Sequence, residues 1–221
     1  MFPKKRIVDL TRLLVPGGEP FKFGVHTYFV EELLPQFHRQ PDDWYILQEW
    51  ELSSHVGTHV ESPYHHLRDG TDVAGLDLGR LIGDAVVLDF RHRDPDDCIT
   101  LEDLKKLETE VRAGDIVLVH TGYDRDYGKP DYGRPYLAQE LVDWLVDLPI
   151  SCLGIDASGI EQYKAPSQPS HLKLLSAGIP IIEELTNLRS ISRDRFIFVG
   201  FPLRVQGADA CPIRAVALEE L

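Results

Sequence analysis

The sequence predicts an α/β fold with a mixed sheet, formed as a single domain. Short apolar segments typical of strands recur along the chain, and few helical segments separate them. The chain has 221 residues, which is within the range of one domain. Hydrophobic residues make up 43% of it and aromatic residues 9%, enough to fill a sizeable core. We therefore expect residues 1–221 to form one domain.

The first third of the chain predicts two strands around an aromatic segment. Residues 7–14 have the pattern of an opening strand, which the turn residues Pro16, Gly17 and Gly18 end. Residues 19–45 are rich in aromatic side chains and either cover a pocket or form a packed loop or an edge strand. Residues 46–62 have the pattern of one long strand, and the glycines at 70 and 75 indicate a loop beyond it.

The remaining elements follow from apolar runs and cap signals. Thr100 is a candidate N-cap, with Asp103 where a capping box places an acid, and Ser170 is a candidate N-cap for a later helix. We expect helices at 100–107, 136–148 and 170–177, and strands at 84–90, 115–121, 152–156, 179–184 and 196–201.

Charge and cysteine content limit the classes of partner and compartment. The formal net charge of −13 disfavours nucleic acid and anionic membranes as partners, but it leaves a small-molecule substrate open. The sequence contains neither an apolar run of about 20 residues nor the apolar core of a signal peptide at its start. Cys98, Cys152 and Cys211 are odd in number and widely spaced, which predicts free thiols and a cytoplasmic location.

Four histidines and a carboxylate lie within 12 residues, at positions 55–66. Gly57, Pro63 and the β-branched residues between them disfavour a helix here. In an extended chain His55, His59, Glu61 and His65 share one face, because side chains alternate. Two imidazoles and a carboxylate that converge on one point suit a divalent transition metal. Gly57 then leaves a gap through which an ion or a substrate can approach.

An ordinary polar strand with hydrogen-bonded histidines is the alternative interpretation. His171 and Glu183 add little by themselves. His171 follows Ser170 at a predicted helix start, where a side chain is often exposed. Glu183 ends an apolar strand, where a charge is often just solvated.

The motif His55-x-Gly-Thr-His59-x-Glu61-x-Pro-x-His65 resembles the signature His-x-Gly-Thr-His-x-Asp-x-Pro-x-His of the cyclase family. That family includes bacterial kynurenine formamidase (arylformamidase) and isatin hydrolase. Further segments resemble the family in the same order along the chain, at residues 7–10, 115–123, 154–156, 171–188 and 202–216.

The resemblance implies a swivelling β/β/α fold and a homo-oligomer, a dimer or a tetramer, whose subunits contribute to each other's pockets. It also implies one or two zinc or manganese ions per subunit. His55, His59 and Glu61 would then bind the first ion and His171 the second, while Glu61 and Glu183 bridge the two. His65 matches the family's proton-transfer residue.

Three departures from the family pattern bear on the chemistry. Glu61 stands where the family usually has Asp, and its extra methylene moves the carboxylate by about 1.5 Å. Ser158-Gly-Ile-Glu161 replaces the usual Pro-Ser-x-Asp, and residues 19–24 lack the tryptophan of the formamidases. The last two changes put the substrate in question more than the reaction.

Three functions fit these residues. The first is a metal-dependent amidohydrolase that opens a C–N bond in a small aryl formamide or cyclic amide, similar to N-formylkynurenine or isatin, with His65 as the general acid and base. The second is a metal-dependent lyase or dehydratase, and the third a degenerate metal-binding protein without activity. The chain has no Gly-x-Ser-x-Gly motif, and Cys152 and Cys211 have the pattern of core residues.

Overall fold

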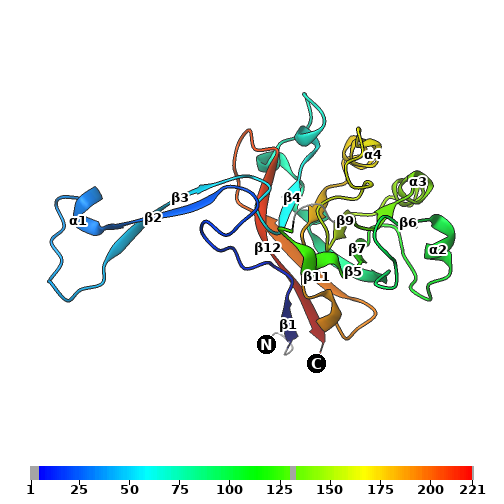
Figure 1. Ribbon diagram of the computed structural model, residues 1–221, viewed down its shortest axis with the longest axis horizontal. Helices are drawn as coiled ribbons and strands as arrows, with labels where there is room; N and C mark the ends of the chain where they lie inside the picture. Colours follow the sequence, from blue (N-terminus) through cyan, green and yellow to red (C-terminus); the bar gives the residue numbers. More distant parts are fainter. Residues whose placement is uncertain (1–4, 130–132, 221) are drawn as a thin grey trace.

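The computed structural model describes residues 5–129 and 133–220, and its centre is a mixed eight-stranded sheet in the order β1-β12-β11-β5-β7-β9-β10-β4 (Figure 1). β12 pairs with β11 and also with β4, so seven of these strands close into a ring. The strands of this sheet are β1 (Lys5–Asp9), β4 (His59–Glu61), β5 (Ile82–Asp89), β7 (Ile116–His120), β9 (Cys152–Ile155), β10 (Ile181–Glu183), β11 (Phe196–Pro202) and β12 (Ala210–Glu220).

The parallel strands β5, β7, β9 and β10 form one side of the ring, and the antiparallel strands form the other. The helices α2 (Leu101–Lys105), α3 (Gln139–Asp147) and α4 (Pro169–Ser176) lie together on the side of the parallel strands (Figure 1). This arrangement is the α/β architecture with a mixed sheet that the sequence predicts, in the β/β/α form that the resemblance implies.

Each parallel strand is buried on both faces, because its alternating side chains enter two different cores. Val117 and Val119 of β7 pack with the apolar faces of α3 and α4. Ile116 and Leu118 of the same strand point into the ring, where they meet residues of β4, β11 and β12. Strands covered on both faces are continuous apolar runs, which explains why β7 was recognisable in the sequence.

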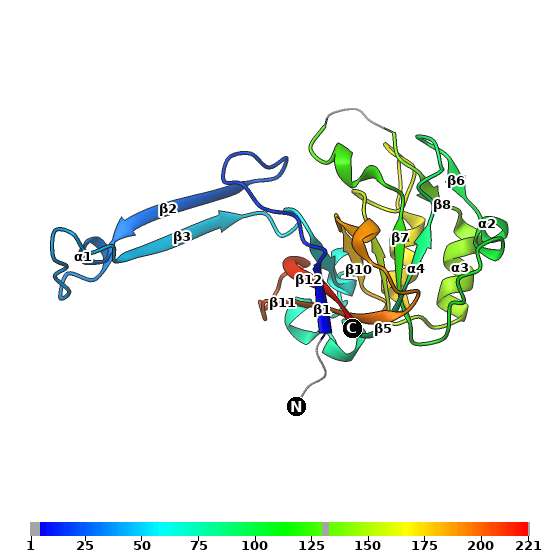
Figure 2. The same ribbon diagram turned by 90° about the horizontal axis from the view of Figure 1, so that it is seen from below.

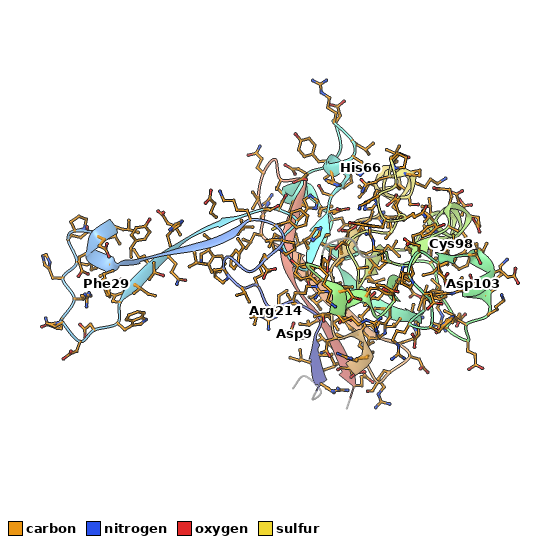
Figure 3. The ribbon with its side chains drawn as sticks, viewed as in Figure 1. Asp9, Phe29, His66, Cys98, Asp103 and Arg214 are labelled. Atoms are coloured by element: carbon orange, nitrogen blue, oxygen red, sulfur yellow. The ribbon has the colours of Figure 1, made fainter. Side chains whose placement is uncertain are left out.

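Residues 19–45 form neither a packed loop nor an edge strand of the main sheet. β2 (Phe23–Phe29) and β3 (Ile46–Leu52) pair only with each other and project away from the body as an arm, with the four-residue helix α1 (Val30–Leu33) at its far end (Figures 1 and 2). Phe29 lies near that end (Figure 3). Trp44 and Trp50 are 77% and 65% exposed, so the arm carries bare apolar surface.

The predicted long strand at 46–62 is therefore wrong. β3 ends at Leu52 within the arm, and β4 begins only at His59 in the main sheet. The chain must turn between these two sheets, and Gly57 adopts the left-handed φ of 60° that such a turn needs. The strand predicted at 7–14 likewise ends early, at Asp9.

The predicted helices were found with small differences at their starts. The capping box of α2 is confirmed, because the Thr100 hydroxyl accepts from the Asp103 N–H and the Asp103 carboxylate accepts from the Thr100 N–H. Ser170 is not an N-cap, because α4 begins one residue earlier at Pro169, which the fixed φ of proline favours. α3 begins at Gln139, since Tyr136 already belongs to a short strand.

The short elements complete the described chain. β6 (Cys98–Ile99) pairs with β8 (Tyr136–Leu137), and the single-turn 3₁₀ helices are η1 (Pro63–His65), η2 (Val73–Gly75), η3 (Leu78–Arg80), η4 (Tyr123–Asp126) and η5 (Leu188–Ser190). All three cysteines are free thiols, and Cys152 and Cys211 are buried as expected. Among the residues described, no helix combines the length and apolar character that a membrane crossing requires.

Candidate metal centre

Three residues of β4 place two polar side chains on the outer face of the ring. β4 lies between β10 and β12, and in this register His59 is opposite Glu183 of β10. Val60 points into the core, so His59 and Glu61 point the other way. Opposite residues of antiparallel strands have neighbouring side chains, and the pairing therefore brings Glu183 to His59.

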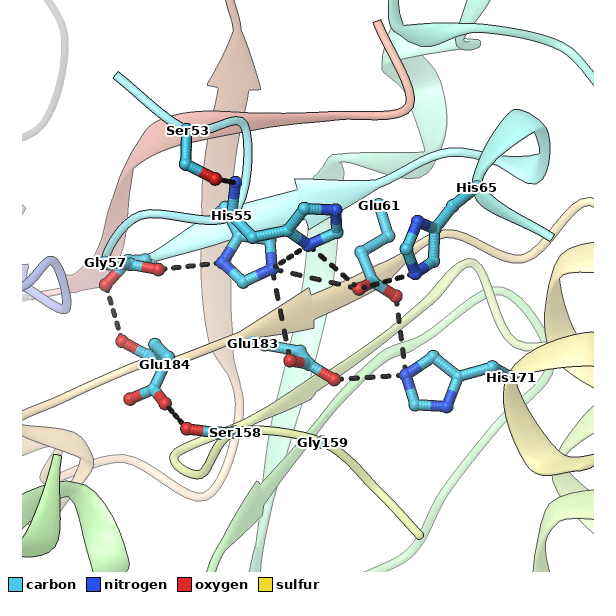
Figure 4. Close-up of polar contacts among 12 residues, drawn as sticks. Ser53, His55, Gly57, Glu61, His65, Ser158, Gly159, His171, Glu183 and Glu184 are labelled. Carbon is cyan, nitrogen blue, oxygen red and sulfur yellow. Dashed lines mark hydrogen bonds and ion pairs between the residues drawn. The ribbon is translucent and has the colours of Figure 1, made fainter. Parts of the chain in front are cut away.

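The donor atoms of five side chains converge at this face (Figure 4). His55 Nδ1 is 3.1 Å from His59 Nε2 and 3.4 Å from Glu61 Oε1. His171 Nε2 is 3.5 Å from Glu61 Oε2 and 3.1 Å from Glu183 Oε1. Glu61 thus directs one carboxylate oxygen to the histidines of its own motif and the other to His171 of α4.

Gly57 shapes the turn that carries His55 but leaves no gap for a ligand. A Cβ at Gly57 would collide with Leu14 Cδ2, so Leu14 already fills the space that the sequence suggests for an ion or a substrate. The Gly57 carbonyl instead accepts a hydrogen bond from His59 Nδ1 at 2.8 Å. That bond fixes the N–H of His59 on Nδ1 and leaves the Nε2 lone pair toward the cluster.

His171 is held in the same manner from the opposite side. It is almost fully buried, and its Nδ1 is hydrogen-bonded to Glu161, which also accepts from the His171 backbone N–H at 3.0 Å. Nε2 is therefore the nitrogen that faces Glu61 and Glu183. Glu161 is one of the departures noted in the sequence, but its role there was not recognised, because ten positions separate it from His171.

His65 joins the cluster through a turn rather than through strand alternation. The 3₁₀ turn η1 brings it back toward Glu61, with His65 Nε2 3.6 Å from Glu61 Oε1 (Figure 4). On its other side, His65 Nδ1 is 3.0 Å from Asp209 Oδ2. Asp209 belongs to the closing segment at 202–216, 144 positions after His65, and the sequence contains no local signal of this contact.

The pKa values of the cluster indicate that its carboxylates favour positive charge at the site. Burial opposes ionisation of Glu61, but the neighbouring imidazoles of His55, His59 and His171 hold its pKa well below its usual range. Burial lowers the pKa of His55, whereas the neighbouring carboxylates of Glu61 and Asp209 raise it to about 9. Burial also lowers the pKa of His171, but Glu161 and Glu183 raise it to about 10. These carboxylates therefore stabilise bound positive charge.

The residues present fit a divalent metal ion. Glu61 Oε2 is buried without a hydrogen-bond partner among the described residues. A buried carboxylate oxygen of this kind fits a metal ligand, because a cation would satisfy it. Imidazole nitrogens with carboxylate oxygens are the donor set of zinc and of other first-row divalent ions. The cluster lines a cavity of about 320 Å³, whose walls are Phe21, His55, His59, Glu61, His65, Ser158, Gly159, Gln168, His171, Glu183 and Glu184.

A closed mixed ring that carries a cluster of three imidazoles and two carboxylates has the architecture and the donor set of metal-dependent hydrolases. The family model described as putative cyclase matches residues 8–162, and the chain belongs to that family. The chain is an amidohydrolase enzyme of the metal-dependent type.

Two relatives show how far the sequence similarity extends. Kynurenine formamidase of Salinibacter ruber is 30% identical over 165 residues, 75% of this chain and 76% of that protein. An uncharacterized protein of Methanocaldococcus jannaschii is 29% identical over 213 residues, 96% of this chain and 98% of the relative.

Solved structures share the fold over the full length. A potential metal-dependent hydrolase with cyclase activity superposes with a TM-score of 0.77 at 26% identity, covering 99% of this chain and 100% of the other. An isatin hydrolase bound to the product analogue thioisatinate has a TM-score of 0.84 over 98% of this chain and 93% of its own. Its identity is 23%, so this second similarity concerns the fold alone.

The structure brings together every site residue that the sequence singled out: His55, His59, Glu61, His65, His171 and Glu183. The residues that sequence reasoning missed are those behind the cluster, which hold the imidazole rings in place. They belong to loops, and their spacing from the histidines has no local pattern.

Proposed function

We propose that His55, His59, Glu61, His171 and Glu183 bind one or two divalent ions, zinc or manganese. The observation that carries this proposal is the convergence of their donor atoms from β4, β10, α4 and the preceding turn. Zinc sites of catalytic enzymes use such nitrogen and oxygen ligands and keep a position open for water or substrate.

The two oxygens of Glu61 support a site for two ions. Oε1 lies near His55, His59 and His65, and Oε2 lies near His171. A carboxylate with its oxygens directed to separate histidine groups has the geometry of a bridge. The longer side chain of glutamate, compared with the aspartate of the family, extends that bridge toward α4.

The proposed reaction is hydrolysis of the C–N bond in a small aryl formamide or cyclic amide. A bound divalent ion supplies Lewis acidity and lowers the pKa of water from about 15.7 to about 7. His65 Nε2 faces the cluster and is free to take a proton from the attacking water. As the C–O bond forms and the C–N bond breaks, His65 returns that proton to the departing nitrogen.

The substrate class follows from the cavity and the relatives together. A cavity of about 320 Å³ is at the lower end of the range of about 300–1,000 Å³ for small-molecule sites. Phe21 lines it and offers an aromatic surface. Relatives with the name kynurenine formamidase favour a compound similar to N-formylkynurenine. The motif at residues 55–65 resembles a family that includes isatin hydrolase, so a cyclic amide such as isatin is the second candidate.

We also propose a homo-oligomer, a dimer or a tetramer, assembled through the arm. Phe29, Trp44, Tyr45 and Trp50 expose aromatic surface to water. They belong to the arm, which projects away from the body of the protein (Figure 1). Aromatic residues of this kind are enriched at the centres of protein interfaces. A cytoplasmic location is proposed from the free thiols, and residues 1–221 are proposed to fold as one domain.

Hydrolysis assays test the proposed function. Protein loaded with zinc or manganese should hydrolyse N-formylkynurenine or isatin, and removal of the metal by a chelator should abolish that activity until metal is restored. If the loaded protein hydrolyses neither compound, the proposed substrate class is wrong. If activity survives complete metal removal, the proposed role of the cluster is wrong.

A further inference from the structure

One carboxylate oxygen holds two of the histidines in the cluster. Asp209 lies directly before β12, and its Oδ2 is 2.9 Å from His55 Nε2 and 3.0 Å from His65 Nδ1. The other two histidines have separate partners, since His59 donates to the Gly57 carbonyl and His171 is bonded to Glu161. On the side away from Glu61, His55 and His65 thus share one acceptor, Asp209 Oδ2.

We infer that Asp209 is a positioning residue that fixes the ring tautomers of His55 and His65 at the same time. With Asp209 in place, His65 presents Nε2 to the substrate and His55 presents Nδ1 to the metal. This inference rests on the proposed function, because Asp209 acts through two histidines to which that function assigns their roles.

The chemistry of imidazole makes this assignment specific. A neutral imidazole has one N–H and one lone pair, and an ionised carboxylate accepts hydrogen bonds but donates none. In the neutral imidazoles that metal binding requires, the nitrogens that face Asp209 therefore carry the hydrogens, and the lone pairs lie on His55 Nδ1 and His65 Nε2. Both of these atoms point to Glu61, since they lie 3.4 Å and 3.6 Å from its Oε1.

The backbone around Asp209 fixes its side chain relative to the site. Its carbonyl oxygen accepts hydrogen bonds from the Ser62 N–H at 2.9 Å and from the Ser62 hydroxyl at 2.8 Å, directly beyond β4. The next residue, Ala210, pairs with Glu61 in the sheet. Asp209 is thus tied to the strand that carries the proposed ligands, as a supporting residue of a preorganised site must be.

Because His55 and His65 share Asp209 as acceptor, loss of Asp209 should reduce metal affinity and catalytic rate together. Loss of a carboxylate behind a metal-binding histidine typically weakens metal affinity by about 10–100-fold. Loss of a correctly placed general acid and base typically costs about 10²–10⁴ in rate. A residue that merely supported the loop at 204–209 would change the stability of the protein but would not couple these two effects.

The decisive experiment compares wild type, Asp209→Asn, His65→Ala and the double variant. Asp209→Asn keeps the shape of the side chain and removes its charge. We expect kcat to fall by about 10²–10⁴ in both single variants and the double variant to be within about threefold of His65→Ala, because Asp209 acts through His65. If the two effects on kcat multiply instead, Asp209 does not act through His65.

Metal affinity provides the readout that does not depend on turnover. Competition with a chelator should show zinc bound about 10–100-fold more weakly by Asp209→Asn than by His65→Ala. Asp72→Asn is the matched control, since Asp72 accepts from the Gly207 N–H in the same loop and touches neither histidine. Equal zinc affinity of Asp209→Asn and wild type, or an equal loss in Asp72→Asn, would overturn the inference.

Ring ¹⁵N chemical shifts of the zinc-loaded protein test the tautomers directly. We expect the hydrogen of His65 on Nδ1 and that of His55 on Nε2, and we expect this preference to be lost in Asp209→Asn. The opposite tautomers in the wild type would refute the inference even if the enzyme is active. Absence of hydrolysis together with the expected tautomers would count against the proposed substrate class alone.

Discussion

Substitution of Glu61 tests whether its carboxylate binds the metal and bridges the histidines of the motif at 55–65 to His171. Its Oε2 reaches within 3.5 Å of His171 Nε2. Glu61→Asp withdraws the carboxylate by about 1.5 Å, the length of one C–C bond. Oε1 contacts His55 and His65, which lie in the same segment as residue 61 and can shift with it. Oε2 contacts His171, which belongs to the separate helix α4 and cannot follow.

We therefore expect the Glu61→Asp variant to bind metal still. Its affinity for a second ion per chain should fall, or its preference among metals should change. Glu61→Gln keeps the length and removes the charge from a side chain that is 2% exposed. Removing one partner of a buried ionic group costs about 3–5 kcal/mol, or about 10²–10⁴ in a binding constant. Metal affinity should fall by that factor in Glu61→Gln and by less than about tenfold in Glu61→Asp.

The assay is the number of ions bound per chain and their affinities, measured by titration of metal-free protein, with hydrolysis measured in parallel. Glu184→Gln is the matched control. It removes a neighbouring buried carboxylate that pairs with Arg12 at 2.9 Å, so it should reduce the stability of the fold without weakening metal binding. Equal behaviour of Glu61→Gln and Glu61→Asp would refute the reasoning, because it would mean that Glu61 does not bind the metal.

Three further predictions concern the proton carrier, pH and assembly. His65→Ala should lower kcat by about 10²–10⁴ and leave most of the metal bound; near-full activity, or loss of the metal, would show that its role is different. The pKa values of about 9 for His55 and about 10 for His171 mean that the metal-free site holds protons at neutral pH, so metal must displace them. Affinity should therefore rise with pH from 6 to 8 by about tenfold per unit for each proton displaced, and a constant affinity would contradict these pKa values. Replacement of Trp44 and Trp50 by serine should reduce the molar mass measured by light scattering to that of a smaller assembly, and an unchanged mass would exclude the arm as the interface.

The sequence predicted the elements whose signals are local. The capping box of Thr100 and Asp103 and the doubly buried strand β7 are both complete within a few residues. The arm was not predicted, because residues 46–62 have the pattern of one strand, whereas β3 ends at Leu52 and a turn between Ser53 and Gly57 separates it from β4. The closure of the ring depends on the pairing of β4 with β12, which joins residues such as His59 and Pro212 that are far apart in sequence.

In the site, too, local sequence signals were recognised and contacts between distant residues were not. The side chains that converge on the cavity were recognised from their type and spacing, although the strand alternation that suggested their common face extends only from His59 to Glu61. His55 and His65 reach the cluster through a turn on either side of β4. Asp209 and Glu161 were missed because a residue that orients a ligand is defined by a contact in space, and a single sequence carries no record of that contact.

The central claim is that His55, His59, Glu61, His171 and Glu183 form a metal site, and anomalous X-ray scattering from a crystal of the zinc-loaded protein tests it most directly. The account predicts one or two peaks at the zinc absorption edge, within about 2.0–2.2 Å of the imidazole nitrogens and carboxylate oxygens of these residues. Peaks only elsewhere on the protein, or no peak in the cavity when zinc is in excess in the crystal solution, would contradict it.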